Sequence, residues 1–419
     1  MVLPKMLFAN EEQFMSHRLR LFILEYNFSM SAYWICTGFL IAKLTQYYNL
    51  PLGLSNLLTG LSSTFLVLQP VGGLFYARLN HKHRFLVGMN VLWRVSICLV
   101  FFTVLLPMSS GAAIFCILLF VMQGVQQLSA PAYENWQVEL AEAEHCTSYY
   151  TARETLFMLI YTVANAAVQI TISVAERMGN LQAGFFLAGI AEAVLLLISL
   201  AILPLLSAPV AGRSQGGSLT TLLQVLKNKD HTKVIMANAS WCFANVFVGG
   251  LFGVYAVRVL NIDFITLMIW GTAGNILRGA FAPVFSRIAS RIGWKTCLSN
   301  LFVLYALLAL LLFFSGPQNG FWIAPIYLVL STLPMSGISV GTLQLRVATS
   351  DAEMRSVYFS AYSLISGVAS LVGTSICSAL IEVLDKNTAG LPLQSLYLLG
   401  LLLLVFPFVL FRNLPKDVR

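Results

Sequence analysis

Long apolar runs are the feature of this sequence that most constrains its fold. Of its 419 residues, 58% are hydrophobic and 10% are charged, whereas a soluble domain normally carries about 25% charged residues. A helix that crosses a bilayer needs about 20 predominantly apolar residues. We therefore predict an all-α membrane protein with twelve transmembrane helices, placed near residues 20–44, 52–77, 85–107, 111–132, 152–175, 182–206, 234–259, 264–288, 296–315, 320–341, 357–383 and 391–411.

The distribution of basic residues predicts how the chain is oriented. Twelve spans place both termini on one side, and most of the 25 Lys and Arg fall in the loops of that side. The positive-inside rule then makes both termini cytoplasmic. The first 17 residues contain Glu11 and Glu12 and no apolar leader stretch, so no signal peptide is expected. We expect a multi-pass protein of a bacterial cytoplasmic (inner) membrane, and we read the net charge of +8 as a topology signal rather than a nucleic-acid site.

Cysteine and histidine give no sign of metal or redox chemistry. The seven cysteines are scattered without a C-x-x-C pair, and the five histidines fall near the cytoplasmic ends of the predicted spans. No P-loop and no set of nucleophile, base and acid is visible. We expect no metal, no cofactor and no catalytic residue, and hence no enzyme.

Two loops recur in corresponding places, which indicates an internal repeat. The segment 73–82 follows the second predicted span, and the segment 286–295 follows the eighth; both have a small first residue, an arginine sixth and a lysine tenth. The acidic segments 142–144 and 351–353 recur at nearly the same offset. Self-similarity of this kind is the signature of a duplicated unit. We predict an N-terminal six-helix bundle at 1–206, a cytoplasmic linker with a short interfacial helix at 207–233, and a C-terminal six-helix bundle at 234–419.

These loops resemble motifs of the major facilitator superfamily. Its G-x-x-x-D-R-x-G-R-R/K loop is matched in the first half by Gly73, Arg78 and Lys82, although Ala77 replaces the acid, and in the second half by Arg291, Gly293 and Lys295. Its W-x-x-E-L-x-P-x-x-x-R-x-x-Y-F-x-x-R stretch is resembled by Trp136, Glu139, Leu140, Tyr149, Tyr150 and Arg153. The resemblance covers essentially the whole chain. It implies two pseudo-symmetric bundles that open a central cavity to each side in turn, lined mainly by spans one, four, seven and ten.

Polar side chains follow one face of each of those spans. Because unpartnered amides and hydroxyls are costly in hydrocarbon, such faces should meet protein or water. For single serines, hydrogen bonding between helices is the favoured alternative; for the three glutamines of span four, a cavity is favoured. The candidate substrate-cavity residues are Glu25, Ser29, Tyr33, Gln123, Gln126, Gln127, Asn238, Trp241, Asn245 and Arg278.

Ionisable residues inside the spans are functional candidates because they are costly there. Arg94 and Glu192 lie deep in spans three and six, and we expect them to form a structural ion pair. Arg278 in span eight has no charged counterpart in span two. It either binds an anionic or polar group of the substrate or pairs with an acid such as Glu25. Glu25 is also the candidate for proton coupling; the alternative is a glutamate that faces water near the inner mouth.

Charged residues at the cytoplasmic ends of the two halves suggest a gate that stabilises one state of the cycle. Simple anchoring of the positive side explains the basic residues equally well, but it does not explain the acids. The candidate gate residues are Arg78, Lys82, Glu142, Arg153, Arg291, Lys295, Asp351 and Arg355.

The sequence thus predicts a secondary active transporter of a small polar organic solute that works by rocker-switch alternating access. Protons or another coupling ion are candidate partners, beside the substrate and the lipid bilayer, and the chain is expected to be a monomer. An exporter or lipid flippase of the same fold is one alternative, and it would need an apolar cavity wall. A non-transporting membrane sensor or scaffold is the other.

Overall fold

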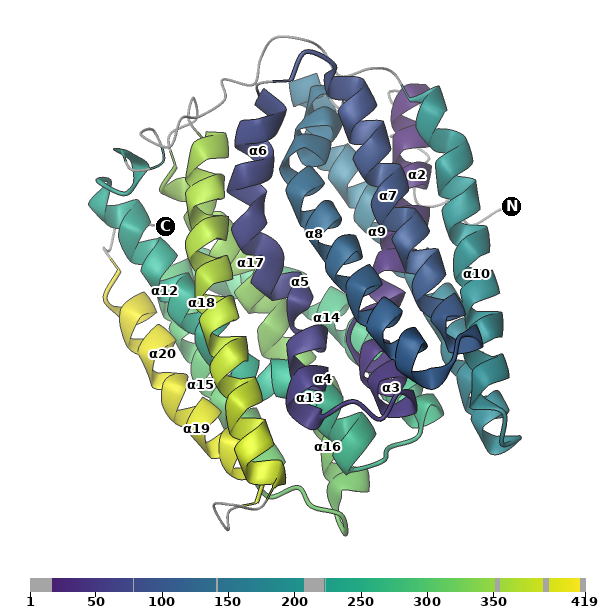
Figure 1. The fold of residues 1–419 in the computed structure, drawn as a ribbon. Helices are drawn as coiled ribbons and strands as arrows, with labels where there is room; N and C mark the ends of the chain where they lie inside the picture. Colours follow the sequence, from purple (N-terminus) through teal and green to yellow (C-terminus); the bar gives the residue numbers. More distant parts are fainter. Residues whose placement is uncertain are drawn as a thin grey trace. The chain divides into compact units, whose positions relative to one another are not determined.

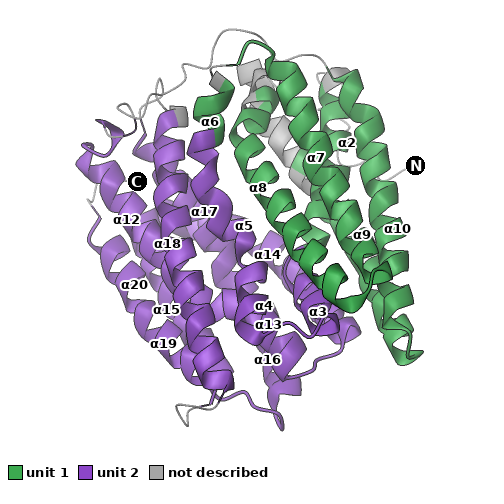
Figure 2. Cartoon of the chain, viewed as in Figure 1, with its two compact units in different colours: residues 1–36, 72–216 green, residues 37–71, 217–419 purple. Residues whose placement is uncertain are grey.

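The chain is helical throughout the part that the structure describes (Figure 1). The structure is a computed structural model, and it describes residues 17–77, 79–140, 142–206, 222, 224–350, 355–386 and 392–414. These residues contain no strand. By the density of contacts the chain divides into two compact units, residues 1–36 with 72–216 and residues 37–71 with 217–419 (Figure 2).

Unit 1 is a bundle of long helices whose buried side chains are mostly aromatic and aliphatic. One cluster centres on Phe22, Tyr133 and Trp136, and the Phe22 and Trp136 rings meet edge to face at 5.0 Å between centroids. Such aromatic pairs prefer an edge-to-face arrangement. The helices of the unit are α2 (His17–Ile35), the greater part of α6 (Gln69–Ala77), α7 (Lys82–Phe102), α8 (Met108–Leu140), α9 (Glu142–Arg177) and α10 (Leu181–Ile202).

Unit 2 holds the helices of the second half together with the short helices between residues 37 and 71. After α12 the helix is interrupted twice, by the π-helical turns Val246–Gly250 and Tyr255–Val259. Such π-turns are frequent at functional sites. The helices of the unit are α3 (Phe39–Tyr47), α4 (Leu52–Thr59), α5 (Leu61–Thr64), α12 (Lys229–Asn245), α13 (Leu251–Val254), α14 (Phe264–Ile292), α15 (Trp294–Phe313), α16 (Gly320–Leu330), α17 (Thr332–Ala348), α18 (Arg355–Asp385), α19 (Ser395–Leu403) and α20 (Val405–Arg412).

The outer surfaces of these helices are apolar, as lipid requires. Ile276, Trp322 and Leu197 are 68%, 70% and 64% exposed, and water would penalise large apolar side chains left open in this way. Among the described residues, nine helices are long and apolar enough to cross a membrane, or up to ten if the pair 52–59 and 61–76, bent by 52°, is one span. The chain is therefore a multi-pass α-helical membrane protein, as predicted. The number of twelve spans stays a prediction.

Helix ends are set by capping residues that the sequence supplies. The side chain of Asn180 accepts a hydrogen bond from the Ala183 amide at 3.1 Å at the start of α10, as an N-cap residue does. Gly293, one of the motif glycines, has φ of 82° between α14 and α15, and its amide donates to the Ala289 carbonyl at 2.8 Å. Only glycine adopts that backbone conformation without strain, so this motif position marks a tight turn.

The predicted linker and the predicted halves do not coincide with the two observed units. Residues 207–221 and 223 of the expected linker, and with them part of the expected interfacial helix, lie outside the described residues. The observed units place residues 37–71 with the second half of the chain. The six-helix bundles at 1–206 and 234–419 and the linker between them remain a prediction.

Candidate functional site

A buried ionic cluster lies inside unit 1 around Glu25 of α2. Its carboxylate accepts hydrogen bonds from the Arg94 guanidinium of α7 and from the Tyr133 hydroxyl of α8. The Ser199 hydroxyl of α10 donates to Glu25 Oε1 at 3.4 Å. Glu25 and Arg94 are both fully buried. Four helices therefore converge on one carboxylate, which is buried in an ion pair and does not face water.

Arg94 is held on its other sides as well. Its Nη2 donates to Asn90 Oδ1 at 3.1 Å, and its guanidinium lies over the Trp93 ring at 5.0 Å from the centroid. Asn90 also accepts from the Trp93 indole at 3.1 Å. The cation is thus positioned by one helical turn of its own helix, and the cation–π contact adds to the ion pair.

The expected pairing of Arg94 with Glu192 is wrong. Arg94 pairs with Glu25, and both carboxylate oxygens of Glu192 are without a hydrogen-bond partner among the described residues. The error has a simple physical origin. Depth along a span can be counted from the sequence at 1.5 Å per residue, but the direction in which a side chain leaves the helix depends on how the helices rotate against one another.

The other candidate residues of unit 1 form a second polar group. The Tyr33 hydroxyl donates to Gln123 Oε1 at 2.6 Å, which joins α2 to α8, and Gln127 is buried on the same helix. Gln126 is partly exposed, and the Ser29 hydroxyl donates to the carbonyl of Tyr26 at 3.1 Å. Tyr33 and Gln123 are thus brought together, whereas Ser29 is satisfied by its own helix.

In unit 2, the three candidates of α12 contact two different neighbours. Asn238 donates to the Ser366 hydroxyl of α18 at 2.8 Å. Trp241 packs against Tyr305 of α15 at 5.1 Å between centroids, and Asn245 accepts from the Tyr305 hydroxyl at 2.7 Å. These residues link helices in the structure, and their role toward a substrate stays a prediction.

Arg278 of α14 donates from Nη2 to the Ser339 hydroxyl of α17 at 3.0 Å, and its side chain is partly exposed. Glu25, the acid proposed as its partner, is paired with Arg94 inside unit 1. Binding of a polar substrate group by Arg278 stays a prediction.

The candidate gate is described only in part. Arg78 and Asp351 and the side chains of Glu142 and Arg355 lie outside the described residues, and Arg291 is exposed. Each of the other three cations has a described contact with a neutral group: Lys82 lies over the Tyr76 ring at 5.4 Å, Arg153 donates to Gln137 Oε1 at 2.8 Å, and Lys295 donates to the carbonyl of Leu414. A charge gate between the halves therefore stays a prediction.

Sequence reasoning missed several members of the buried cluster. Asn90 stands four residues before Arg94, a helical spacing that places both on one face, so this partner was visible in the sequence. Tyr133 and Ser199 offered no such signal, because each comes from another helix. Asn27 of α2 was also missed; it is fully buried, with neither side-chain polar atom hydrogen-bonded to a described residue.

Another polar seam lies within unit 2, where α4 packs on α18. The Glu382 carboxylate accepts from the Gly53 amide at 3.0 Å, and Asn56 donates to the Ser378 hydroxyl at 3.1 Å. A Cβ on Gly53 would lie 2.5 Å from the Ser378 carbonyl oxygen, so only glycine allows the helices to approach this closely. We call these contacts, together with those of Arg258 in the next paragraph, the α4–α18 seam.

Arg258, in the second π-turn, also binds to this region of the chain. Its guanidinium donates to the Ser55 hydroxyl at 2.6 Å and to the carbonyl of Leu50. In the predicted topology residues 45–51 and 260–263 are outer loops, so that topology predicts the seam at the outer end of the spans. Charge-assisted hydrogen bonds of this kind are stronger than neutral ones, and the seam is thus both tightly packed and polar.

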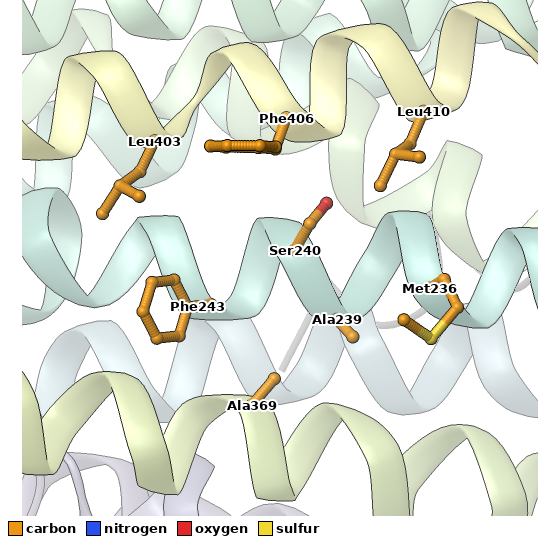
Figure 3. A pocket seen from close by; sticks show the side chains of 8 residues that line it. All are labelled: Met236, Ala239, Ser240, Phe243, Ala369, Leu403, Phe406 and Leu410. Carbon is orange, nitrogen blue, oxygen red and sulfur yellow. The ribbon is translucent and has the colours of Figure 1, made fainter.

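An apolar groove of about 440 Å³ opens on unit 2 between α12, α18 and the helices α19 and α20 (Figure 3). Ser240 is its one lining residue with a polar side chain, and that hydroxyl donates to the carbonyl of Ala237 at 2.7 Å. The groove contains none of the predicted cavity residues. Its lining is Met236, Ala239, Ser240, Phe243, Ala369, Leu403, Phe406 and Leu410.

Comparison with known proteins gives one family and one fold. Residues 24–374 match the family model of the Major Facilitator Superfamily. The structure is similar to a mutant of nucleoside transporter NupG, with a TM-score of 0.67 at 13% identity over 95% of this chain and 100% of that one. It is also similar to a D-xylose–proton symporter (0.67, 14%, 96% and 98%) and to the fucose:proton symporter FucP of E. coli (0.58, 15%, 96% and 98%). No curated protein matches the sequence.

Proposed function

Because the chain belongs to the major facilitator superfamily, we propose that it is a secondary active transporter that moves a small polar organic solute by rocker-switch alternating access. Similar folds carry nucleosides and sugars in NupG and in the xylose and fucose symporters. The family and the similar solved structures are both those of transporters, which supports a transporter rather than an enzyme. We place the chain in the cytoplasmic membrane, as a monomer with both termini inside.

The α4–α18 seam is the observation that carries this proposal. Residues 37–71 belong to the first two spans by sequence, yet they pack with helices of the second half. Glu382 and Arg258 hold them through the Gly53 amide and the Ser55 hydroxyl. A seam at one end of the spans, made of small residues and a few charge-assisted bonds, is suited to close that end and to part again. A rocker-switch cycle requires such a reversible closure.

The breaks in the first two spans support the same interpretation. The helix of span one ends at Ile35 and resumes at Phe39, across Gly38 with φ of 62°. Span two is bent by 52° between α4 and the helices that follow it. Hinges are a few residues at the ends of elements that absorb large changes of backbone angle. The first break lies where unit 1 passes into unit 2 along the chain, and the second lies within residues 37–71 of unit 2.

We further propose that the solute meets the polar residues of spans one, four and seven, with Tyr33, Gln123 and Asn245 among them, and that Arg278 binds a polar or anionic group. We propose proton coupling through Glu25. Its carboxylate is already matched to a fixed cation and two hydroxyls, so a change in its protonation changes the packing of four helices.

A panel of labelled metabolites tests the proposal. Purified protein is reconstituted into vesicles, and uptake of nucleosides, sugars, amino acids and small organic acids is compared with and without a proton gradient. Accumulation of at least one solute that is lost in the Gln123→Ala variant is the expected result. Binding of a solute without any flux would instead support the sensor or scaffold alternative.

The apolar groove favours a second candidate, an exporter or lipid flippase. A groove open at the side of membrane-spanning helices and lined by apolar groups suits an acyl chain rather than a sugar. A fluorescent phospholipid analogue in the same vesicles tests this candidate, since flippase activity would move the label between leaflets only when the protein is present.

A further inference from the structure

Glu192 of α10 is a buried acid that the ionic cluster does not use. Its side chain is fully buried, and both carboxylate oxygens are without a hydrogen-bond partner among the described residues. The helix packs against α2, α7 and α9 in unit 1, which Figure 1 shows as neighbours. The carboxyl is thus enclosed by three helices with nothing polar bonded to it among the described residues.

An unpaired carboxylate is too costly to persist in such a place. Transfer of an isolated ionised carboxyl into a low-dielectric interior costs far more than transfer of the neutral acid, and the group neutralises instead. Glu25 differs because the Arg94 guanidinium and the Tyr133 hydroxyl compensate its charge. Glu192 therefore lacks the compensation that Glu25 has.

The charged and titratable groups around Glu192 are few. The thiols of Cys98 on α7 and of Cys36, directly after α2, interact electrostatically with it. Arg94 lies one turn before Cys98 on α7, and Glu25 and Tyr33 lie before Cys36 on α2. The residues of α9 from 162 to 175 are all neutral. Along α7, Arg94 is the cation nearest in sequence to Cys98.

Arg94 has donors to spare. Its Nε and Nη1 are without a hydrogen-bond partner among the described residues, while Nη2 serves Glu25 and Asn90. Cys98, which interacts with Glu192, is about 6 Å from Arg94 along the axis of α7. That rise is within the span of an extended arginine side chain.

We propose that Glu192 is a second proton-binding site, which holds a proton while Glu25 is ionised and becomes the counter-charge of Arg94 when Glu25 takes up a proton. One proton enters at Glu25 as one leaves Glu192, so the summed charge of the three side chains stays zero in both states. Two acids and one cation of this kind couple their protonation, because a single guanidinium compensates one carboxylate at a time. This inference deepens the proposed proton coupling and rests on it for its role in transport.

Infrared spectroscopy of the full-length protein in lipid vesicles at neutral pH tests the proposal without any transport measurement. The carbonyl stretch of a protonated carboxyl group is expected in the wild type and should be lost in Glu192→Gln. Glu382→Gln is the matched control, since that carboxylate is bonded to the Gly53 amide, and it should leave the band unchanged. If Glu192→Gln does not fold, Glu192→Asp should shift the frequency of the band.

The Glu25→Gln variant tests the exchange. With Glu25 neutral, Arg94 requires Glu192 as its counter-charge, so most of the band should vanish, and it should return in the double variant Glu25→Gln/Arg94→Gln. A band that survives Glu192→Gln would overturn the proton site, and a band that survives Glu25→Gln would overturn the exchange. If the carbonyl band changes as predicted in every variant but no uptake is measured, that result would count against the transporter and not against the proton site.

Discussion

Replacement of Glu25 by glutamine should destabilise unit 1 by about 3–5 kcal/mol, the usual effect of breaking a buried ion pair. Both partners are fully buried, and glutamine keeps the volume and the acceptor for Tyr133, so the loss comes from the broken pair with Arg94 and from the deprotonation of Glu192 that has to replace it. At about 2–4 °C per kcal/mol for domains of 150–250 residues, the melting temperature should fall by roughly 6–20 °C.

Thermal unfolding in detergent measures this effect through the buried thiols. Cys36 and Cys377 are buried and free, so a thiol-reactive dye reports their exposure as the protein unfolds. Asp230→Asn is the control: its pair with Lys233 is 3.6 Å long and more than half exposed, and such pairs contribute about 0–1 kcal/mol. Glu25→Gln/Arg94→Gln should recover much of the loss. Equal melting temperatures for the wild type and Glu25→Gln, or a double variant as unstable as the summed single changes, would refute the reasoning.

Three further predictions concern the seam and the groove. Arg258→Ala removes the bonds that hold the loop before α4, so the reactivity of a cysteine at Asn56 toward an impermeant maleimide should rise several-fold, and an unchanged labelling rate would contradict the role of Arg258. Gly367→Ala places a Cβ 2.3 Å from the Val67 amide nitrogen, so maleimide labelling of the cysteine at Asn56 should rise in this variant too. A variant that labels like the wild type would mean that close packing is unnecessary. Ala369→Trp fills part of the groove; native mass spectrometry should then count fewer retained lipids, and an undiminished count would show that lipid does not occupy it.

The helices and their apolar surfaces could be predicted from the sequence because they depend on local composition. Runs of about 20 apolar residues define spans whatever the rest of the chain does, and the turn at Gly293 follows from the motif in which it stands. The membrane fold and the family likeness were therefore within reach of sequence reasoning.

The partners of buried polar groups could not be predicted from the sequence in the same way. Arg94 and Glu192 lie at similar depths, which suggested a pair, but the rotation of α7 and α10 brings Glu25 to Arg94 instead. Asn90 could be found from its spacing, whereas Tyr133 could not, because its contact with Glu25 joins residues far apart in the sequence.

The seam between α4 and α18 was beyond the sequence for another reason. Apart from Arg258 and Glu382, the residues that form it, such as Gly53 and Ser378, are small and carry no charge. Their importance follows only from the close approach that their size allows.

A disulfide across the seam tests alternating access most directly. In a Cys377→Ser background, cysteines at Asn56 and Ser378 replace side chains that are hydrogen-bonded at 3.1 Å, so oxidation should bridge α4 and α18. If the seam must part during transport, uptake of the solute found in the metabolite panel should stop on oxidation and return with a reductant. Undiminished uptake by fully bridged protein would contradict the account.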